Sequence, residues 1–313
     1  MPQSSSTATH IRLGTRGSPL ALYQAYLVQA QLATAHGLDP TRIVVETIHT
    51  TGDRIQDRPL AEVGGKALFT KEIEEALLAG HIDLAVHSAK DMATILPNGL
   101  LLAACLARED ARDAFVCRAV KSLTALPPGA VVGTTSPRRV AMVKRLRPDL
   151  RVVSLRGNVE TRLRKLDEGA ADATILALAG LKRLGLESAV ASILEVDEFL
   201  PAAGQGIIAI ETREDDRATR ELLAPINDAT AMTALVTERA FLAVLDGTCR
   251  SPIAGYATVT ASAVHLHGMI LKPDGSQVFE TTRAGPIDTA AALGADAGRE
   301  LKGRGGSNYF EGV

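Results

Sequence analysis

The chain has 313 residues, of which 46% are apolar and 22% charged, an ordinary globular composition with enough length for two or three domains. A net charge of −2 provides no global basic field for nucleic acid, and an aromatic content of 3% argues against stacking platforms for bases. The longest apolar runs, at 100–107 and 173–181, are too short to span a bilayer. We therefore expect neither a nucleic-acid nor a membrane partner.

Cysteine usage indicates the compartment. Cys105, Cys117 and Cys249 are odd in number and widely spaced, which favours neither a disulfide framework nor a metal site. Residues 1–10 are polar and lack the basic start and apolar core of a signal peptide. These features predict a reduced, soluble, cytoplasmic protein without a bound metal.

The first third of the chain reads as alternating strands and helices. A strand over 11–13 leads through a turn into a helix over 20–32, with Ser18 as N-cap and Pro19 as first helical residue. A strand over 43–48, a helix over 69–78 and strands over 82–86 and 100–105 follow. Residues 50–66 have no clear period, and we expect a mobile loop that serves as a lid.

The middle of the chain repeats this alternation. A strand over 130–132 precedes a helix capped by Ser136, and a strand over 151–155 precedes a helix capped by Asn158. A buried strand over 173–178 follows. Such alternation predicts parallel α/β sheets with ligands at the carboxyl ends of the strands.

The last third has a different pattern. Residues 201–205 read as a crossing segment, and 206–210 could return to the first sheet. A helix over 231–245, antiparallel strands over 255–260, 264–271 and 277–282, and a last helix after Pro286 predict a small α+β unit. We expect a first domain from 1–106 and 207–224, a second from 111–200 and a third from 229–313.

Arginine residues cluster at predicted strand ends. Arg138 and Arg139 fall in the first turn of a helix, where the macrodipole disfavours cations unless an anionic ligand completes the site. Arg16, Arg156 and Arg162 occupy equivalent positions after other strands. A solvated, salt-bridged face is the usual fate of single arginines, but five such positions favour a polyanion site. The arginines bind carboxylates as well as phosphates, so both ligand classes stay open.

Two further residues could carry chemistry. Asp91 follows a strand beside Lys90 and could stabilise a cation, although the local sequence slightly favours a helix N-cap or a partner for Lys90. Neighbouring His87 reads as a packed residue. Cys249 lies beside Arg250 in a loop rich in small residues, so it could be a nucleophile, a covalent attachment point or an unreactive loop residue.

Six segments occur in an order that resembles one enzyme family, porphobilinogen deaminase. They are GTRGSPLA (14–21), VGGK (63–66), AVHSAKD (85–91), SLRGN (154–158), LAGLKRLG (178–185) and AGQG (203–206). The resemblance implies two α/β domains like type II periplasmic binding proteins plus a small C-terminal α+β domain. It also implies a dipyrromethane cofactor held as a thioether on Cys249.

The family's reaction is what the resemblance implies for function. Four porphobilinogen molecules are condensed head to tail on the cofactor with loss of ammonia, and hydrolysis releases hydroxymethylbilane for tetrapyrrole and heme biosynthesis. Loss of ammonia leaves a cation that an ionised Asp91, the implied catalytic residue, can stabilise. The implied partners are porphobilinogen and the growing polypyrrole chain, and we expect a monomer.

The resemblance also maps the binding residues. The cofactor ligands are Ser88, Lys90, Asp91, Thr134, Ser136, Arg138, Arg139, Arg156 and Cys249. The substrate ligands are Arg16, Arg156, Arg162 and Gln205. The lid residues are Gly52, Asp53, Gly64, Gly65 and Lys66. The alternative is a non-catalytic binding protein for a carboxylated small molecule, since the same arginines would serve it. A cysteine-dependent acyltransferase lacks a histidine base near Cys249 in sequence.

Overall fold

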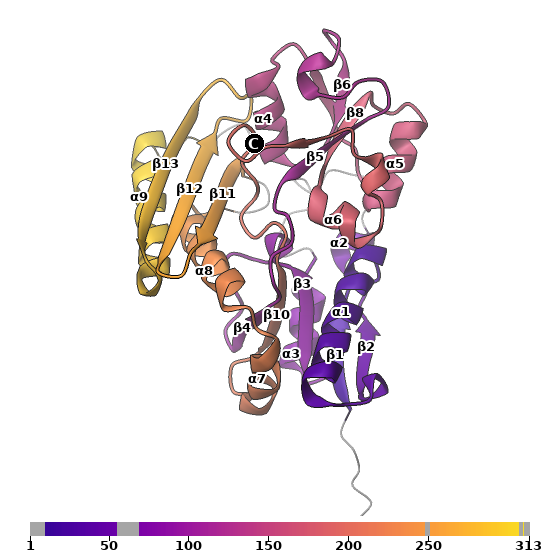
Figure 1. Ribbon diagram of the computed structural model, residues 1–313, viewed down its shortest axis with the longest axis vertical. Coiled ribbons are helices and arrows are strands. Elements are labelled where there is room, and N and C mark those ends of the chain that lie inside the picture. The colour runs from indigo at the N-terminus through magenta and orange to yellow at the C-terminus, as the bar shows by residue number, and fades with distance from the viewer. Residues whose placement is uncertain (1–9, 55–68, 248–250, 307–308, 310–313) are drawn as a thin grey trace, which may run out of the picture.

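The computed structural model describes residues 10–54, 69–247, 251–306 and 309. Two α/β domains lie one above the other, and a small α+β domain packs against the side of the upper one (Figure 1). This is the division into two α/β domains and a C-terminal α+β unit that the sequence predicts.

The first domain is built on a five-stranded sheet of order β2-β1-β3-β10-β4. Its strands are β1 (Ile11–Thr15), β2 (Ile43–Thr47), β3 (Leu84–Ser88), β4 (Leu100–Cys105) and β10 (Ile208–Arg213). Its helices are α1 (Pro19–His36), α2 (Thr51–Arg54), α3 (Lys71–Leu78) and α7 (Arg217–Leu223). Fully buried Leu13, Val28 and Ile210 form part of its core, so the sheet and α1 share one apolar interior.

The second domain has a sheet of the same pattern, ordered β7-β6-β8-β5-β9. Its strands are β5 (Asp113–Cys117), β6 (Val131–Gly133), β7 (Arg151–Val153), β8 (Ala173–Ala177) and β9 (Ser192–Leu194). Its helices are α4 (Pro137–Leu146), α5 (Val159–Asp167) and α6 (Leu178–Arg183).

The expectation of parallel sheets is wrong for one strand in each sheet. β10 runs antiparallel to β3 and β4, and β5 runs antiparallel to β8 and β9. Parallel neighbours need a long crossover connection, usually a helix. β5 and β10 instead enter their sheets directly from the two segments that cross between the domains, so they run in the opposite direction. The return of the chain to the first sheet, expected at 206–210, is confirmed by β10.

The third domain is an antiparallel sheet covered by two helices. Strands β11 (Ile253–Val259), β12 (Ala263–Leu271) and β13 (Val278–Pro286) pair in chain order, as predicted. Helices α8 (Ala229–Val244) and α9 (Ala290–Gly305) pack on them. Gly268 of β12 allows the close approach of α8, because a Cβ there would lie 2.8 Å from the Phe241 ring. Met269 joins the core of the second domain, which fixes the two units together.

Helix starts follow the predicted capping residues. Ser18, Ser136 and Asn158 accept hydrogen bonds from the third residue beyond each of them, and Pro19 and Pro137 are first helical residues. The expected loop over 50–66 is wrong at its start, because α2 forms a helical turn. Glu72 accepts hydrogen bonds from the backbone N–H and the hydroxyl of Thr51, which anchors that turn.

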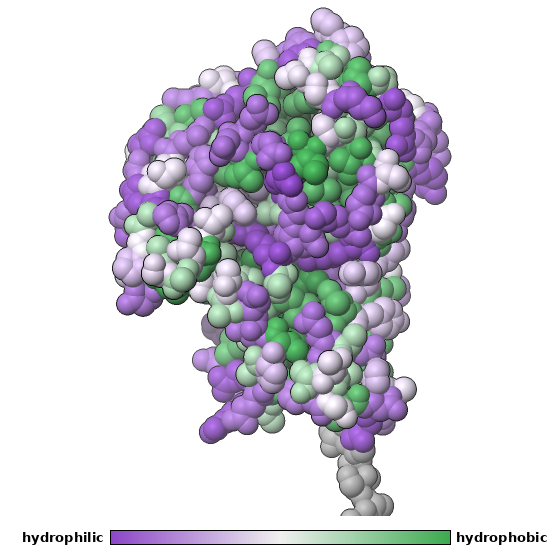
Figure 2. Space-filling model, viewed as in Figure 1, coloured by the Kyte–Doolittle hydropathy of each residue, from purple (hydrophilic) through white to green (hydrophobic). Residues whose placement is uncertain are grey.

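Two crossing segments, 106–112 and 200–207, connect the α/β domains. Glu238 of α8, which is fully buried, accepts hydrogen bonds from Arg108 Nη1 (2.6 Å) and from the backbone N–H of Gly204 (2.5 Å). The third domain therefore holds both crossings through one carboxylate. Figure 2 shows a band of hydrophilic surface where the two α/β domains meet. None of the helices in the described part of the chain combines the length and apolar composition needed to cross a bilayer.

Candidate active site

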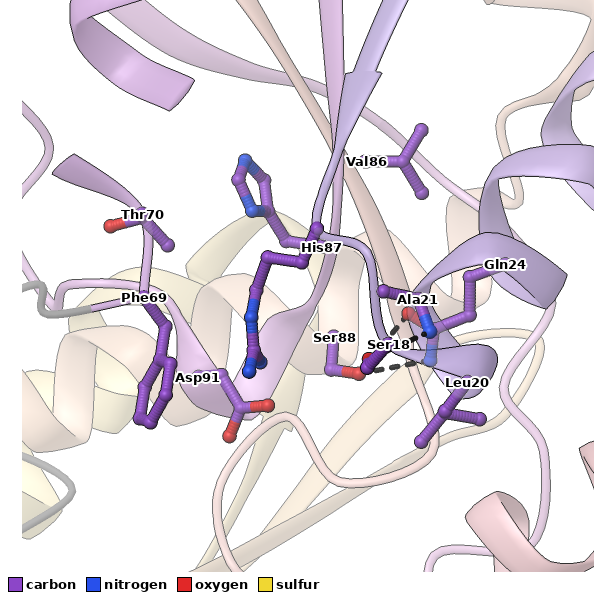
Figure 3. Close-up of a pocket in the computed structure, with 11 residues that line it drawn as sticks. Ser18, Leu20, Ala21, Gln24, Phe69, Thr70, Val86, His87, Ser88 and Asp91 are labelled. Carbon is purple, nitrogen blue, oxygen red and sulfur yellow. Dashed lines mark hydrogen bonds between the residues drawn. The ribbon is translucent and has the colours of Figure 1, made fainter. Parts of the chain in front are cut away.

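A short turn after β3 presents the polar residues of the first domain. β3 ends at Ser88, and a 3-10 turn (Ala89–Asp91) follows, held by a hydrogen bond of 3.0 Å from the Ala89 N–H to the Ile207 carbonyl. Ser88 Oγ accepts a hydrogen bond of 2.9 Å from Gln24 Nε2 of α1 (Figure 3). The turn is thus fixed to the return crossing on one side and to α1 on the other.

Asp91 lies in a pocket at the carboxyl ends of β1 and β3. Arg16, Phe69 and Ser88 line the same pocket, and the Arg16 guanidinium lies 4.3 Å from the centre of the Phe69 ring. The Phe69 ring and the Asp91 carboxylate stand beside each other in Figure 3. The pocket therefore combines a carboxylate, a cation and an aromatic face.

His87 points away from Asp91 in Figure 3. Its Nε2 lies 3.3 Å from Glu211 Oε2 of β10, and both side chains are buried. Glu74 of α3 lies in the same interior, where burial raises the pKa of its carboxyl group and Glu211 adds to that effect. His87 therefore packs in the core behind the pocket.

The Arg138–Arg139 pair is buried and already has a protein anion. Asp113, the first residue of β5, accepts a hydrogen bond of 2.7 Å from Arg138 Nη2 and one of 2.6 Å from Arg139 Nη2. Burial alone would raise the pKa of Asp113, but the two guanidinium groups outweigh it and lower this pKa to about 2. The expectation that only an arriving ligand completes this helix end is wrong, since the chain supplies a carboxylate from 25 residues away.

Gln205 joins this pair to the turn of the first domain. Its Nε2 donates to Asp113 Oδ1 at 3.1 Å, and its Oε1 accepts from Lys90 Nζ at 3.3 Å. Gly204 and Gly206 on either side have φ of 74° and 91°. A Cβ at Gly206 would lie 2.3 Å from the Glu109 carbonyl oxygen, so only glycine lets the two crossings approach here.

The cationic residues of both α/β domains share one environment. Burial lowers the pKa of Lys90 to about 8, with a further lowering from Arg139 and an opposing effect of Asp91. Burial likewise lowers the pKa of Arg162 to about 10, and Arg139 and Arg156 act in the same direction. Arg162 remains partly exposed, and its charge interacts with Asp91 of the first domain. Lys90 and Asp91 of the first domain thus face Arg139 and Arg162 of the second.

Two hydroxyl residues flank the arginine pair. Thr134 is buried, and its Oγ1 accepts a hydrogen bond of 3.2 Å from the Ser136 N–H. Ser136 Oγ accepts from the Arg139 N–H at 3.4 Å as the N-cap of α4. Both lie at the start of α4, where the first backbone N–H groups have no acceptor within the helix backbone.

The remaining predicted site residues divide between two places. Gly52 and Asp53 belong to the backbone of α2. Gly64, Gly65, Lys66 and Cys249 lie outside the described residues. Within the described residues no group of three or more His, Cys, Asp or Glu side chains could hold a metal ion.

The charge of the cleft suits a ligand with several carboxylates, as a dipyrromethane is. Lys90, Arg138, Arg139 and Arg162 outnumber the two carboxylates, Asp91 and Asp113, that act on them. Within the described residues, Arg138 Nε is a buried donor without a partner. Cations held in low dielectric attract anions strongly, so the residues present fit such a group.

Sequence reasoning missed three residues of the site: Asp113, Gln24 and Phe69. Asp113 offers one signal, since it is the only charged residue of an otherwise apolar stretch that forms a fully buried strand. Gln24 is a buried polar residue on the inner face of α1, and Phe69 is one of six phenylalanines in the chain. Neither carries a local pattern that points to a pocket.

The chain is similar to known proteins over nearly its whole length. A family model described as porphobilinogen deaminase, dipyrromethane cofactor binding domain, matches residues 11–221, and the model of the C-terminal domain matches 232–303. The porphobilinogen deaminases of Nitrobacter hamburgensis and Nitrobacter winogradskyi are 58% and 57% identical over 310 residues, covering 99% of this chain and 98% of each relative.

A solved structure was also found, a periplasmic substrate-binding protein of an ABC transporter from Coxiella burnetii. It is 15% identical, covers 71% of this chain and 94% of its own, and has a TM-score of 0.43. The family models and the Nitrobacter relatives cover nearly the whole chain, and together with the cationic cleft they establish that it belongs to the porphobilinogen deaminase family, transferases with a dipyrromethane-binding domain.

Proposed function

We propose that this transferase uses Asp91 as its catalytic residue in the head-to-tail condensation of four porphobilinogen molecules, with release of ammonia at each step and final hydrolysis to hydroxymethylbilane. The observation that carries the proposal is the position of Asp91. Its carboxylate lines one pocket with Arg16 and Ser88, and its charge acts on Lys90 of the same turn and on Arg162 of the second domain.

We expect the Asp91 carboxylate to stabilise the cationic intermediate and to hold the reacting pyrrole ring. When ammonia leaves porphobilinogen, the C–N bond breaks with its electron pair on nitrogen, and the pyrrole ring becomes cationic. A fixed carboxylate in a site of low dielectric stabilises that charge. The same oxygens can accept a hydrogen bond from the pyrrole N–H, which keeps the reacting ring in place.

The cations bind the acetate and propionate groups of the pyrroles. We assign Ser88, Lys90, Asp91, Thr134, Ser136, Arg138, Arg139 and Arg156 to the cofactor. We assign Arg16, Arg156, Arg162 and Gln205 to the substrate. The dipyrromethane, attached through Cys249, supplies when bound the free pyrrole carbon on which the first condensation takes place. Attachment keeps successive additions in one geometry.

The segment 50–66 is proposed as the lid, with Gly52, Asp53, Gly64, Gly65 and Lys66. The proposed domain limits are 1–106 with 207–224, 111–200 and 229–313, which the strand membership of the three sheets supports. We also propose a monomer in the cytoplasm. The free, buried thiols of Cys105 and Cys117 are compatible with a reducing compartment.

Intact mass and ammonia release test the proposal together. The purified protein should exceed its sequence mass by one discrete adduct, which Cys249→Ser should lack, and it should release ammonia from porphobilinogen. Full activity of an unmodified protein would contradict the attachment. Reversible binding of porphobilinogen without ammonia release would instead support a binding protein.

A further inference from the structure

Asp113 is the centre of a buried network that neither the resemblance nor the capping pattern assigns. Its carboxylate has no exposed surface and meets two guanidinium groups and one amide. Arg139 donates to Oδ1 through both Nε (3.1 Å) and Nη2 (2.6 Å), while Arg138 donates to Oδ2. Such contacts fix the rotation of both guanidinium planes.

The same network spans the connection between the α/β domains. Asp113 begins β5 at the end of the first crossing, and Gln205 lies on the return crossing. Arg138 also donates to the Leu200 carbonyl at 2.8 Å, again on the return crossing. The side chain of Gln205 also accepts a hydrogen bond from Lys90 Nζ in the first domain. The Asp113 carboxylate therefore contacts Arg138 and Arg139 of the second domain directly and Lys90 of the first domain through Gln205.

We propose that Asp113 is a positioning residue that holds Arg138 and Arg139, and through Gln205 the Lys90 ammonium, in the arrangement that receives pyrrole carboxylates. The inference rests on the proposed function of these cations, and it deepens that function by naming the group that aligns them. Asp113 touches no substrate in this role. It acts by geometry and by the negative charge it places beside three cations.

The charge of Asp113 should affect the pKa of Lys90. Four charged groups act on this ammonium: Asp91 from its own turn, Asp113 from β5, and Arg138 and Arg139 from α4. The two carboxylates raise the pKa of Lys90 and the two guanidinium groups lower it. Without Asp113, one of the two opposing carboxylates disappears, so Lys90 should lose its proton at lower pH.

Asp113→Asn tests the proposal because it removes the charge at nearly constant shape. An NMR titration of the Lys90 side chain, assigned with Lys90→Arg, should move by about half a pH unit or more toward lower pH. This readout does not require turnover, and it is compared between proteins with the same cofactor content because Lys90 is a proposed cofactor ligand. The KM for porphobilinogen should rise about tenfold, and the alkaline limb of kcat/KM should move with the titration.

Two variants provide controls. Asp113→Glu keeps the charge but displaces the carboxylate by one methylene, so KM should rise while the Lys90 titration stays near that of the wild type. Asp83→Asn is a matched change elsewhere. Asp83 also lies between two arginines, 2.7 Å from Arg12 Nη2 and 3.6 Å from Arg213 Nη2, but at the opposite end of β3. It should leave both KM and the Lys90 titration unchanged.

The outcomes distinguish the positioning role of Asp113 from the proposed function. An unmoved Lys90 titration in Asp113→Asn, even with a raised KM, would overturn the proposal, since Asp113 would then act on the fold alone. Should Asp113→Asn fail to fold, a wild-type KM in Asp113→Glu would overturn it equally. Adduct mass and ammonia release of the wild-type protein decide the proposed function separately.

Discussion

Thr94 Oγ1 donates a hydrogen bond of 2.7 Å to the backbone carbonyl of Gly247. Thr94 follows Asp91 by three residues, and Gly247 precedes Cys249 by two. Arg239 of α8 donates to the carbonyls of Ala93 and Thr94 at 2.7 and 2.9 Å. The segment after the turn that carries Asp91 is therefore fixed to α8 and to the residues that connect α8 with the proposed attachment residue.

Thr94→Val should weaken this connection. The variant keeps the shape of the side chain but leaves the Gly247 carbonyl without its donor, so the free energy of unfolding should fall by about 1 kcal/mol. The kcat should fall more than KM rises, because the change touches no binding residue. Urea unfolding and steady-state kinetics measure both. Thr94→Ser keeps the hydroxyl and should behave as the wild type; equal losses in Ser and Val would contradict the assigned hydrogen bond.

Local signals made part of the fold predictable. The starts of α1, α4 and α5 depend on a capping side chain and the next three residues, all of which a sequence displays. The antiparallel insertion of β5 and β10 depends on partners 56 or more residues away in β8 or in β3 and β4. No local pattern encodes such a pairing, so the strand direction was predicted wrongly, and β5 and β9 of the second sheet were not predicted as strands.

The candidate site shows the same division. Arg138 and Arg139 could be placed at a helix start from sequence, but their partner could not, since Asp113 meets them only through the order of the strands. Likewise, the sequence shows Gln205 only as one residue of a glycine-rich motif. Its contact with Asp113 exists because the fold brings the two crossing segments together. Sequence identified the cations, and tertiary packing decides which anion they hold.

The pH dependence of activity should follow Lys90. Because the pKa of Lys90 is lowered to about 8, the ammonium is lost as pH rises through this value, and kcat/KM should fall there. Lys90→Arg keeps a cation at high pH and should remove this alkaline limb. A limb that stays near pH 8 in Lys90→Arg would assign it to another group.

Stability should change in the opposite direction over the same range. The pKa of Lys90 lies below the usual 10.5 of an unfolded lysine, so the unfolded chain binds more protons between about pH 8 and 10.5. The contribution of this residue to the free energy of unfolding therefore rises with pH in that window. Comparing wild type with Lys90→Met by urea unfolding at several pH values isolates it; a contribution that falls with pH would be inconsistent.

Glu238→Gln should destabilise the junction of the three domains. The Glu238 carboxylate accepts hydrogen bonds from the Arg108 side chain and from the backbone N–H groups of Gly204 and Ala257. These three donors belong to separate segments of the chain. Breaking a buried ion pair on one side costs about 3 kcal/mol or more, because the remaining charge stays buried. Urea unfolding measures the loss. The exposed pair of Arg217 and Glu221 is the control, since Glu221→Gln should cost about 0.5 kcal/mol or less.

Phe69→Leu should weaken substrate binding through Arg16. The ring lies 4.3 Å from the Arg16 guanidinium, and a cation–π contact of this kind contributes about 0.5–1 kcal/mol. Its loss should raise the KM for porphobilinogen about two- to fivefold with little change in kcat. Phe69→Tyr retains an aromatic face and should stay near the wild type. Equal KM values for the Leu and Tyr variants would argue against an aromatic contribution.

Asp91→Asn should separate binding from condensation. The amide keeps the shape of the carboxylate, and the cations that hold the pyrrole carboxylates remain, so the affinity for porphobilinogen should change little. The negative charge that stabilises the cationic ring is lost, and removal of one such electrostatic group lowers kcat by about 100-fold or more. Ammonia release in a single turnover measures this step directly. Asp91→Glu, which restores the charge with displaced geometry, should recover part of the rate. A near-normal rate in Asp91→Asn would remove Asp91 from its assigned role, since no other carboxylate among the described residues that line this pocket could replace it.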